Sequence, residues 1–185
     1  MRILKPLAIL AALGLGSAPV PSAGQTLIED FSMPSAQRWR FFSDGVMGGV
    51  STGQMAILQD NGTSFARMTG RVSTANNGGF IQMRLDLPAP PPEATAGVRL
   101  VVRGNSQRYF VHLRTTGTVL PWQYYQAPFE VTGDWREVRI PLERFTPSGR
   151  LLRRVPQARS LSSVAVVAFG RDHQAEIDVR EIAFY

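Results

Sequence analysis

The chain has 185 residues, of which 44% are hydrophobic, and it contains two histidines and no cysteine. The lack of cysteine excludes disulfides, thiolate metal sites and a cysteine nucleophile. The net charge of +6 comes from basic residues that are scattered along the chain, which excludes the continuous basic stripe of a nucleic-acid-binding protein.

Residues 1–23 have the layout of a secretory signal peptide. Arg2 and Lys5 precede an uncharged apolar run over residues 7–15, and small residues and prolines follow as far as Gly24. The run is shorter than the ~20 residues of a membrane-spanning helix. We therefore expect a periplasmic or secreted protein with no membrane span after cleavage, in which residues 24–185 form a single domain.

The rest of the chain is rich in short stretches that alternate between apolar and polar residues, as β-strands with one buried face do. Residues 164–169 are apolar throughout, which is typical of a strand buried on both faces. Turn-forming residues separate the stretches, and the prolines of residues 88–92 favour a stiff crossover between two sheets. The pattern predicts an all-β antiparallel β-sandwich. The alternating stretches are residues 65–71, 80–87, 98–103, 109–115, 135–140 and 177–185.

Two glycine-rich stretches, residues 44–51 and 76–80, indicate tight turns with a defined conformation. Glycine reaches positive φ without a Cβ clash, and Asp, Asn and Ser side chains bond back to nearby backbone. We expect at least one glycine of each Gly-Gly pair to have positive φ. Met47, at the crest of the first turn, either anchors the turn in the core or is presented to a partner.

Seven short motifs follow one another along the chain. They are Asp44-Gly45-Val46-Met47-Gly48-Gly49-Val50-Ser51, Asn76-Asn77-Gly78-Gly79-Phe80, Arg108-Tyr109, Tyr125-Gln126-Ala127-Pro128-Phe129, Trp135, Ile140-Pro141 and Phe145-Thr146-Pro147. In this order they resemble the complex I intermediate-associated protein family, 30-kilodalton type, from about residue 27 to residue 185.

The resemblance implies a jelly-roll β-sandwich of the galactose-binding-domain-like kind. It also implies a non-enzymatic assembly factor or chaperone-like protein that acts on respiratory complex I. One turn departs from the family: residues 104–107 read Gly-Asn-Ser-Gln, where an acidic Gly-Asp-Gly turn is more usual. A role for that turn's carboxylate is therefore not carried over.

The sequence offers poor material for catalysis. His112 lies in a predicted strand and His173 in a predicted turn, so neither is placed between an acid and a serine as in a nucleophile triad. Glu176 and Asp178 share one strand face, which we expect to be an exposed polar face. We expect no catalytic residue, no cofactor and no metal site, although the sequence leaves a structural calcium open.

Two kinds of partner remain open. The family resemblance implies a protein, bound at the loop end that carries the two glycine-rich turns. The alternative is a carbohydrate, because the aromatic residues between positions 109 and 129 either stack on sugar rings or pack the sandwich core. The candidate binding residues are Asp44, Met47, Gly48, Gly49, Ser51, Asn76, Asn77, Gly78, Gly79, Tyr109, Trp122 and Tyr124.

Strand alternation also predicts a basic surface. In residues 80–86, 98–103 and 109–115, several arginines and one histidine lie opposite the apolar side chains. If the three strands belong to one sheet, these side chains converge and form a weak site for a carboxylate, a sulfate or a phosphorylated glycan. Otherwise they form a solvated outer face. The residues are Arg84, Arg99, Arg103, His112 and Arg114.

Overall fold

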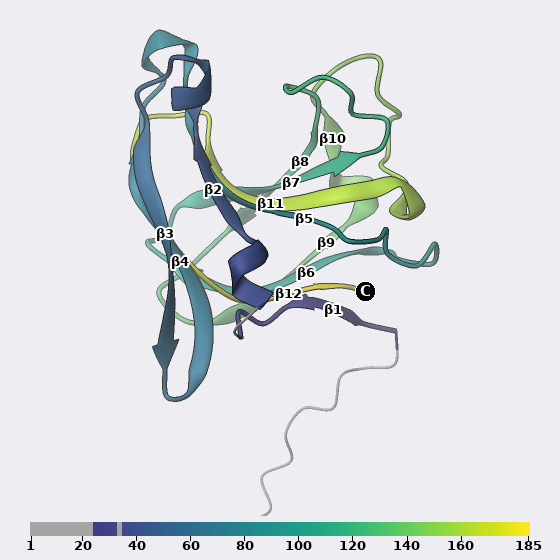
Figure 1. Cartoon of the computed structure of the whole chain (residues 1–185), viewed down its shortest axis with the longest axis horizontal. Coiled ribbons are helices and arrows are strands. Elements are labelled where there is room, and N and C mark those ends of the chain that lie inside the picture. Colours follow the sequence, from purple (N-terminus) through teal and green to yellow (C-terminus); the bar gives the residue numbers. More distant parts are fainter. Residues whose placement is uncertain (1–23, 33–34) are drawn as a thin grey trace, which may run out of the picture.

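The computed structural model describes residues 24–32 and 35–185, which form two antiparallel sheets packed face to face (Figure 1). Sheet A contains, in spatial order, β3 (Thr52–Asp60), β4 (Thr63–Val72), β12 (His173–Phe184), β6 (Gly97–Gly104) and β9 (Arg136–Pro141), and β1 (Thr26–Glu29) pairs with β12. Sheet B contains β10 (Thr146–Pro147), β8 (Tyr125–Glu130), β7 (Arg108–Thr115), β11 (Leu161–Phe169), β5 (Phe80–Asp86) and β2 (Arg40–Ser43).

Short 3-10 helices connect several strands. They are η1 (Ser35–Arg38), η2 (Asp44–Met47), η3 (Ala75–Asn77), η4 (Leu142–Arg144) and η5 (Ala158–Ser160). Within the described ranges no helix has the length and apolar character needed to cross a membrane. The predicted signal peptide lies outside the described residues, so export stays a prediction.

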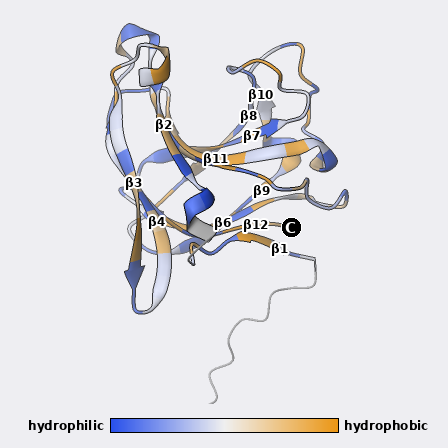
Figure 2. Cartoon of the chain, in the orientation of Figure 1, coloured by the Kyte–Doolittle hydropathy of each residue, from blue (hydrophilic) through white to orange (hydrophobic). Residues whose placement is uncertain are grey.

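The predicted β-sandwich is confirmed. The alternating stretches form β4, β5, β6, β7, β9 and β12, and the continuous apolar stretch lies in β11, between β7 and β5. The proline-rich residues 88–92 connect β5 of sheet B to β6 of sheet A, so the predicted crossover between sheets is also confirmed. Figure 2 shows hydrophobic and hydrophilic residues following one another along the strands, as expected for strands with one face toward the core.

The core lies between the sheets, and it includes Tyr109 of β7. The Tyr109 ring is fully buried, and its hydroxyl donates to Asn105 Oδ1 and accepts from the Glu176 N–H, both at 2.8 Å. Burial raises the pKa of Tyr109 to about 12. The expectation that Tyr109 binds a ligand is therefore wrong, because a buried and fully bonded phenol cannot reach one.

The outer face of sheet A carries a network of ion pairs centred on Asp178. Its buried carboxylate accepts from Arg67 Nε at 2.6 Å and from Arg103 Nε at 2.8 Å. Arg99 is paired in the same way, with Glu137 at 2.7 Å and Glu181 at 2.8 Å.

Two expectations about this face are wrong. Asp178 is buried, not exposed, because two guanidinium groups cover it. Arg99 and Arg103 do not join the other predicted basic residues, because the chain crosses from sheet B to sheet A before β6 begins. Acidic neighbours already neutralise both arginines, so they are not available to an external anion.

Candidate functional site

The two glycine-rich stretches meet at the carboxylate of Asp44. This side chain is fully buried, and it accepts hydrogen bonds from the Ser51 N–H at 2.9 Å, the Ser51 hydroxyl at 2.5 Å, the Gly79 N–H at 2.5 Å and the Phe80 N–H at 3.2 Å. Burial opposes ionisation of the carboxyl, but these hydrogen bonds outweigh it and lower the pKa of Asp44. One charged group therefore holds together two turns that are far apart in the sequence.

The glycines of these turns have two different physical tasks. Gly48 has a φ of +87° and Gly79 a φ of +130°, which confirms that each pair needs a residue with left-handed backbone. Gly49 and Gly78 instead give the carboxylate room, because a Cβ built on either would collide with atoms of Asp44. Asp44, Ser51 and these glycines thus shape the turns, and the expectation that the buried Asp44 and Ser51 side chains contact a partner is wrong.

The junction leaves apolar side chains on the surface. Val46 is 74% exposed and Met47 is 60% exposed, so Met47 is presented to solvent and is not a core anchor. Asn76 and Asn77 lie exposed on the neighbouring turn, both with positive φ. These four residues form the crest of what we call the Asp44 lobe.

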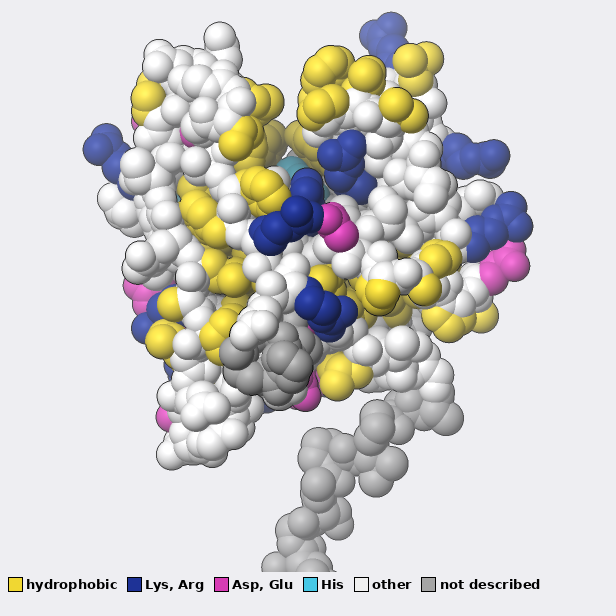
Figure 3. All heavy atoms as spheres, viewed as in Figure 1, with side chains coloured by type: hydrophobic (Ala, Val, Ile, Leu, Met, Phe, Trp, Pro, Cys, Tyr) yellow, Lys and Arg dark blue, Asp and Glu magenta, His cyan; other side chains and the backbone are white. Residues whose placement is uncertain are grey.

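A hollow lies beside this lobe, over the outer face of sheet B (Figure 3). Strand register places five residues in one row across the sheet: Arg40, Arg84, Ala165, His112 and Gln126. Ala165, on the central strand, is buried but belongs to no part of the core between the sheets. Its small side chain lies low in the row, between the longer side chains of the neighbouring strands.

Aromatic side chains line the same face. The Tyr124 ring stacks on the His112 ring, with a centroid distance of 4.2 Å and an interplanar angle of 9°. Phe169 meets both Phe110 and His112 edge-on, at 5.8 Å and 5.6 Å. Trp122 is 63% exposed in the loop beyond Tyr124. The predicted aromatic cluster is therefore divided: Tyr109, Tyr125 and Phe129 pack the core, whereas Phe110, Trp122 and Tyr124 belong to the outer face of sheet B and its loops.

A family model described as complex I intermediate-associated protein 30 (CIA30) matches residues 29–178. The chain belongs to this family. The match confirms the resemblance that the seven motifs indicate, and all seven lie within the matched region. No curated protein matches the CIA30-family chain.

Several solved structures with the same fold are carbohydrate-binding modules. A family 11 module from Clostridium thermocellum, in complex with a β-1,3-1,4-mixed-linked tetrasaccharide, superposes with a TM-score of 0.69 and 12% identity, over 86% of this chain and 94% of that one. A family 30 module of a Clostridium thermocellum cellulosomal cellulase gives a TM-score of 0.53 and 12% identity, over 74% and 90%. At such identities the CIA30-family chain shares the fold with these modules.

Three polar atoms on the floor of the hollow are buried and have no hydrogen-bond partner in the described part of the chain. They are Arg84 Nε, His112 Nε2 and Gln126 Oε1, and all belong to the row across sheet B. Native proteins pair nearly all buried polar groups. Each has a polar neighbour all the same: Arg84 Nε lies 3.3 Å from Asp86 Oδ1, and His112 and Gln126 are paired across β7 and β8.

His112 is nine-tenths buried against Tyr124 and Phe169. Burial lowers the pKa of His112 to about 3, and a side-chain hydrogen bond with Gln126 opposes only part of this shift. The imidazole is therefore neutral at physiological pH, and it offers the hollow a hydrogen-bonding group without charge.

The low pKa of His112 predicts a pH-dependent stability. Below about pH 6.5 the unfolded chain binds a proton at His112 that the folded chain does not bind, so the free energy of unfolding falls by about 1.4 kcal/mol per pH unit. Urea titrations at pH 7 and pH 5 should show a loss for the wild type that is about 2 kcal/mol larger than the loss for His112→Gln. An equal loss in both proteins would mean that His112 is protonated in the folded state.

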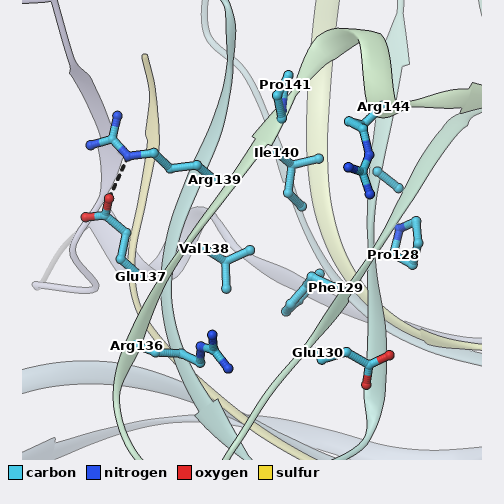
Figure 4. A pocket seen from close by; sticks show the side chains of 11 residues that line it. Pro128, Phe129, Glu130, Arg136, Glu137, Val138, Arg139, Ile140, Pro141 and Arg144 are labelled. Carbon is cyan, nitrogen blue, oxygen red and sulfur yellow. Dashed lines mark hydrogen bonds and ion pairs between the residues drawn. The ribbon is translucent and has the colours of Figure 1, made fainter.

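Two other hollows offer fewer groups that could bind a ligand. One, of about 280 Å³, lies between β8 and β9, where Arg139 Nε donates to Glu137 Oε1 at 2.6 Å (Figure 4). Another, of about 510 Å³, lies near Glu93, Glu143 and Arg159. Neither is lined by a buried unpaired polar atom of the described residues. Residues 24–32 and 35–185 also contain no group of three His, Asp or Glu side chains that would hold a metal.

The sequence did not identify every residue of the hollow. Phe42 and Arg40 lie in a strand of four residues, which is too short for its alternation to be recognised. Gln126 lies in β8, where Pro128 argues against a strand. Phe169 belongs to the apolar stretch that was expected to be buried on both faces, and its ring instead faces the hollow with Phe110.

Proposed function

We propose that this CIA30-family protein is a non-enzymatic binding module that acts as an assembly factor, and that it holds a protein partner at the Asp44 lobe and the adjoining hollow. The observation that carries the proposal is the exposed pair Val46 and Met47, held on a turn that the buried Asp44 carboxylate fixes. A rigid apolar pair loses little conformational entropy when it binds, so its contact area contributes efficiently to affinity.

The opposite side of the hollow supports the same conclusion. The loop after β7 exposes Val119 at 80%, together with Leu120 and Trp122, and the loop after β10 exposes Leu151. Figure 3 shows apolar side chains on both raised sides of the hollow. Soluble proteins seldom expose several large apolar side chains together without a partner, and Met and Trp are enriched in protein interfaces. Two apolar rims favour a protein surface over a sugar chain.

The predicted export of the chain narrows the kind of partner. With a secretory signal in residues 1–23, the partner would itself be exported, or would be the external part of a membrane complex. The family name refers to intermediates of complex I and names no side of the membrane.

The crest is tested by one charged substitution. Met47→Asp should reduce capture of the partner by about tenfold or more without changing the melting temperature, because an exposed side chain contributes contact area but does not hold the core. The measurement is affinity capture with the mature protein from its native extract, quantified by mass spectrometry.

Leu27→Asp is the matched control, because Leu27 is also exposed, at 55%, but lies on β1 and not on the Asp44 lobe. Capture should survive this change. If both variants retain the same partner, the crest is not the binding surface. If Met47→Asp unfolds the protein, the side chain has a structural role instead.

A glycan is the second candidate ligand, and the stacked rings of Tyr124 and His112 favour it. Aromatic faces and hydrogen-bonding groups without charge are the usual elements of a sugar site, and the hollow contains both. One fold neighbour was solved with a mixed-linked tetrasaccharide. Under this alternative, Tyr124→Ala abolishes retention on a polysaccharide matrix, whereas Met47→Asp leaves retention unchanged.

A further inference from the structure

One end of the hollow contains an excess of positive charge. A depression of about 280 Å³ lies over β5, β11 and the end of β7, and Arg84, Asp86 and Arg114 line it together with Thr118, Ser162 and Ser163. Register places Asp86, Ser163 and Arg114 side by side across three neighbouring strands. Arg40 reaches the same carboxylate from the edge strand β2.

Of the residues that the structure describes, three guanidinium groups and only one carboxylate lie at this depression. Asp86 is paired with Arg40, and it lies 3.3 Å from Arg84 Nε. Arg114 donates to the carbonyl oxygens of Thr118 and Leu120, at 2.9 Å and 3.0 Å, and no salt bridge joins it to an acid of the described residues. Burial lowers the pKa of Arg84, and repulsion from Arg40 and Arg114 adds to this against the attraction of Asp86.

The Arg84 side chain is held in place, but one of its N–H groups makes no hydrogen bond within the described ranges. Its guanidinium lies over the Phe42 ring, 4.5 Å from the centroid, and its buried Nε has no hydrogen-bond partner among the described residues. Arg114 is fixed by the two carbonyl groups of its loop. Two fixed cations that face one depression form a preorganised anion site, because little side-chain entropy is lost when an anion enters.

The single carboxylate at the site offsets only part of the positive charge of the three arginines, so the depression still attracts an anion. Arg84 lines the depression and also belongs to the row across the hollow, so a segment with an acidic residue among apolar ones would satisfy both features. The chemistry therefore favours a carboxylate on a peptide.

We propose that Arg84 and Arg114 form a carboxylate-binding subsite that receives an acidic side chain of the protein partner. This inference rests on the proposed function for the claim that the carboxylate belongs to a protein partner. The claim that the two arginines bind a carboxylate does not depend on it. It also assigns a task to two of the basic residues that strand alternation identified, and it leaves Arg99 and Arg103 of sheet A out.

The chemistry is tested with small probes on the whole mature chain labelled with ¹⁵N. N-acetylglutamate methylamide should shift the Arg84 Nε–H signal saturably, whereas N-acetylglutamine methylamide should not. Arg84→Gln and Arg114→Gln should each weaken binding of the glutamate probe by about tenfold. Arg108→Gln is the matched control, because Arg108 is on the same sheet but is already paired with Glu130 at 2.8 Å. Equal shifts with both probes, or no shift at low ionic strength, overturn the subsite.

Two further probes decide the kind of anion. Inorganic phosphate tests whether charge alone decides binding, and phosphate binding tighter than that of the glutamate probe would overturn a subsite for carboxylates. Galacturonate oligomers represent an acidic glycan, and binding tighter than that of the glutamate probe would overturn a peptide ligand.

Partner capture separates this inference from the proposed function. If capture depends on Met47 but not on Arg84, the proposed function stands and the subsite is wrong. If the glutamate probe binds but capture does not depend on Met47, the subsite stands and the apolar crest is not the interface. The inference expects capture to fall with Arg84→Gln and to survive Arg108→Gln.

Discussion

Asp44→Ala should lower the free energy of unfolding by about 3 kcal/mol or more, because it leaves several buried donors without an acceptor. The Ser51 hydroxyl and the Gly79 N–H both lie within 2.5 Å of the present carboxylate, and neither is exposed to water in the folded chain. Loss of the carboxylate should also release both glycine-rich turns. Urea unfolding at neutral pH, followed by far-ultraviolet circular dichroism, measures the loss.

Asp134→Ala is the control for this prediction, because Asp134 is exposed and the change should cost less than about 0.5 kcal/mol. Since the folded pKa of Asp44 is below its unfolded value, its contribution is complete above about pH 4 and is lost as the pH falls through the folded pKa. Asp44→Asn should therefore flatten the pH dependence of stability in that acidic range. A cost for Asp44→Ala that equals that of the control would show that water replaces the lost acceptor.

The second large effect is expected at Gly49 and Gly78. A Cβ at either position would lie closer to Asp44 atoms than real Cβ contacts do, and the buried carboxylate cannot move without losing its hydrogen bonds. We expect Gly49→Ala and Gly78→Ala each to destabilise the protein by about 2–3 kcal/mol. Thermal melts followed by circular dichroism should show a lower melting temperature for both.

Gly48→Ala and Gly133→Ala are the comparison variants, because alanine at these positions would not collide with Asp44. At Gly48 a Cβ would meet no atom within 4 Å, so only the left-handed backbone opposes alanine, at a cost of about 1–2 kcal/mol. At Gly133 there is open space and no positive φ, so the cost should be smaller still. The expected order of stability is Gly133→Ala, then Gly48→Ala, then the two variants that collide with Asp44. A Gly48→Ala variant less stable than Gly49→Ala would contradict the steric explanation.

Much of the fold can be predicted from the sequence because burial enforces alternation. The strands with one face in the core, such as β5 and β7, were predicted nearly to their ends. β3 was missed because it lies at the edge of sheet A and is exposed along most of its length, so its pattern is weak. β10 has only two residues, which is below what a pattern can reveal.

The candidate site was predicted less well, because its residues come together only through contacts between distant parts of the chain. Alternation correctly placed Arg84 and Arg99 opposite the core, but alternation cannot tell which sheet a strand joins. The crossover over residues 88–92 places β5 and β6 in different sheets. The predicted crossover therefore conflicted with the assumption that the arginines of both strands share one sheet face. Likewise, no local pattern indicates that Asp44 bonds to Gly79, because that contact exists only after folding.

Ala165 is a position where a substitution would change the outer face of sheet B but not the core between the sheets. It is the smallest side chain of its row, and its neighbours across the strands are Arg84 and His112. A larger residue here would press on its neighbours across the strands and not on the side chains between the sheets, because Ala165 is buried but is not part of that core. The capacity of the hollow can thus change through one position while the scaffold stays intact. A substitution at this one position would therefore reshape the outer face of sheet B, at the cost of about 1–3 kcal/mol that is typical of overpacking a buried position.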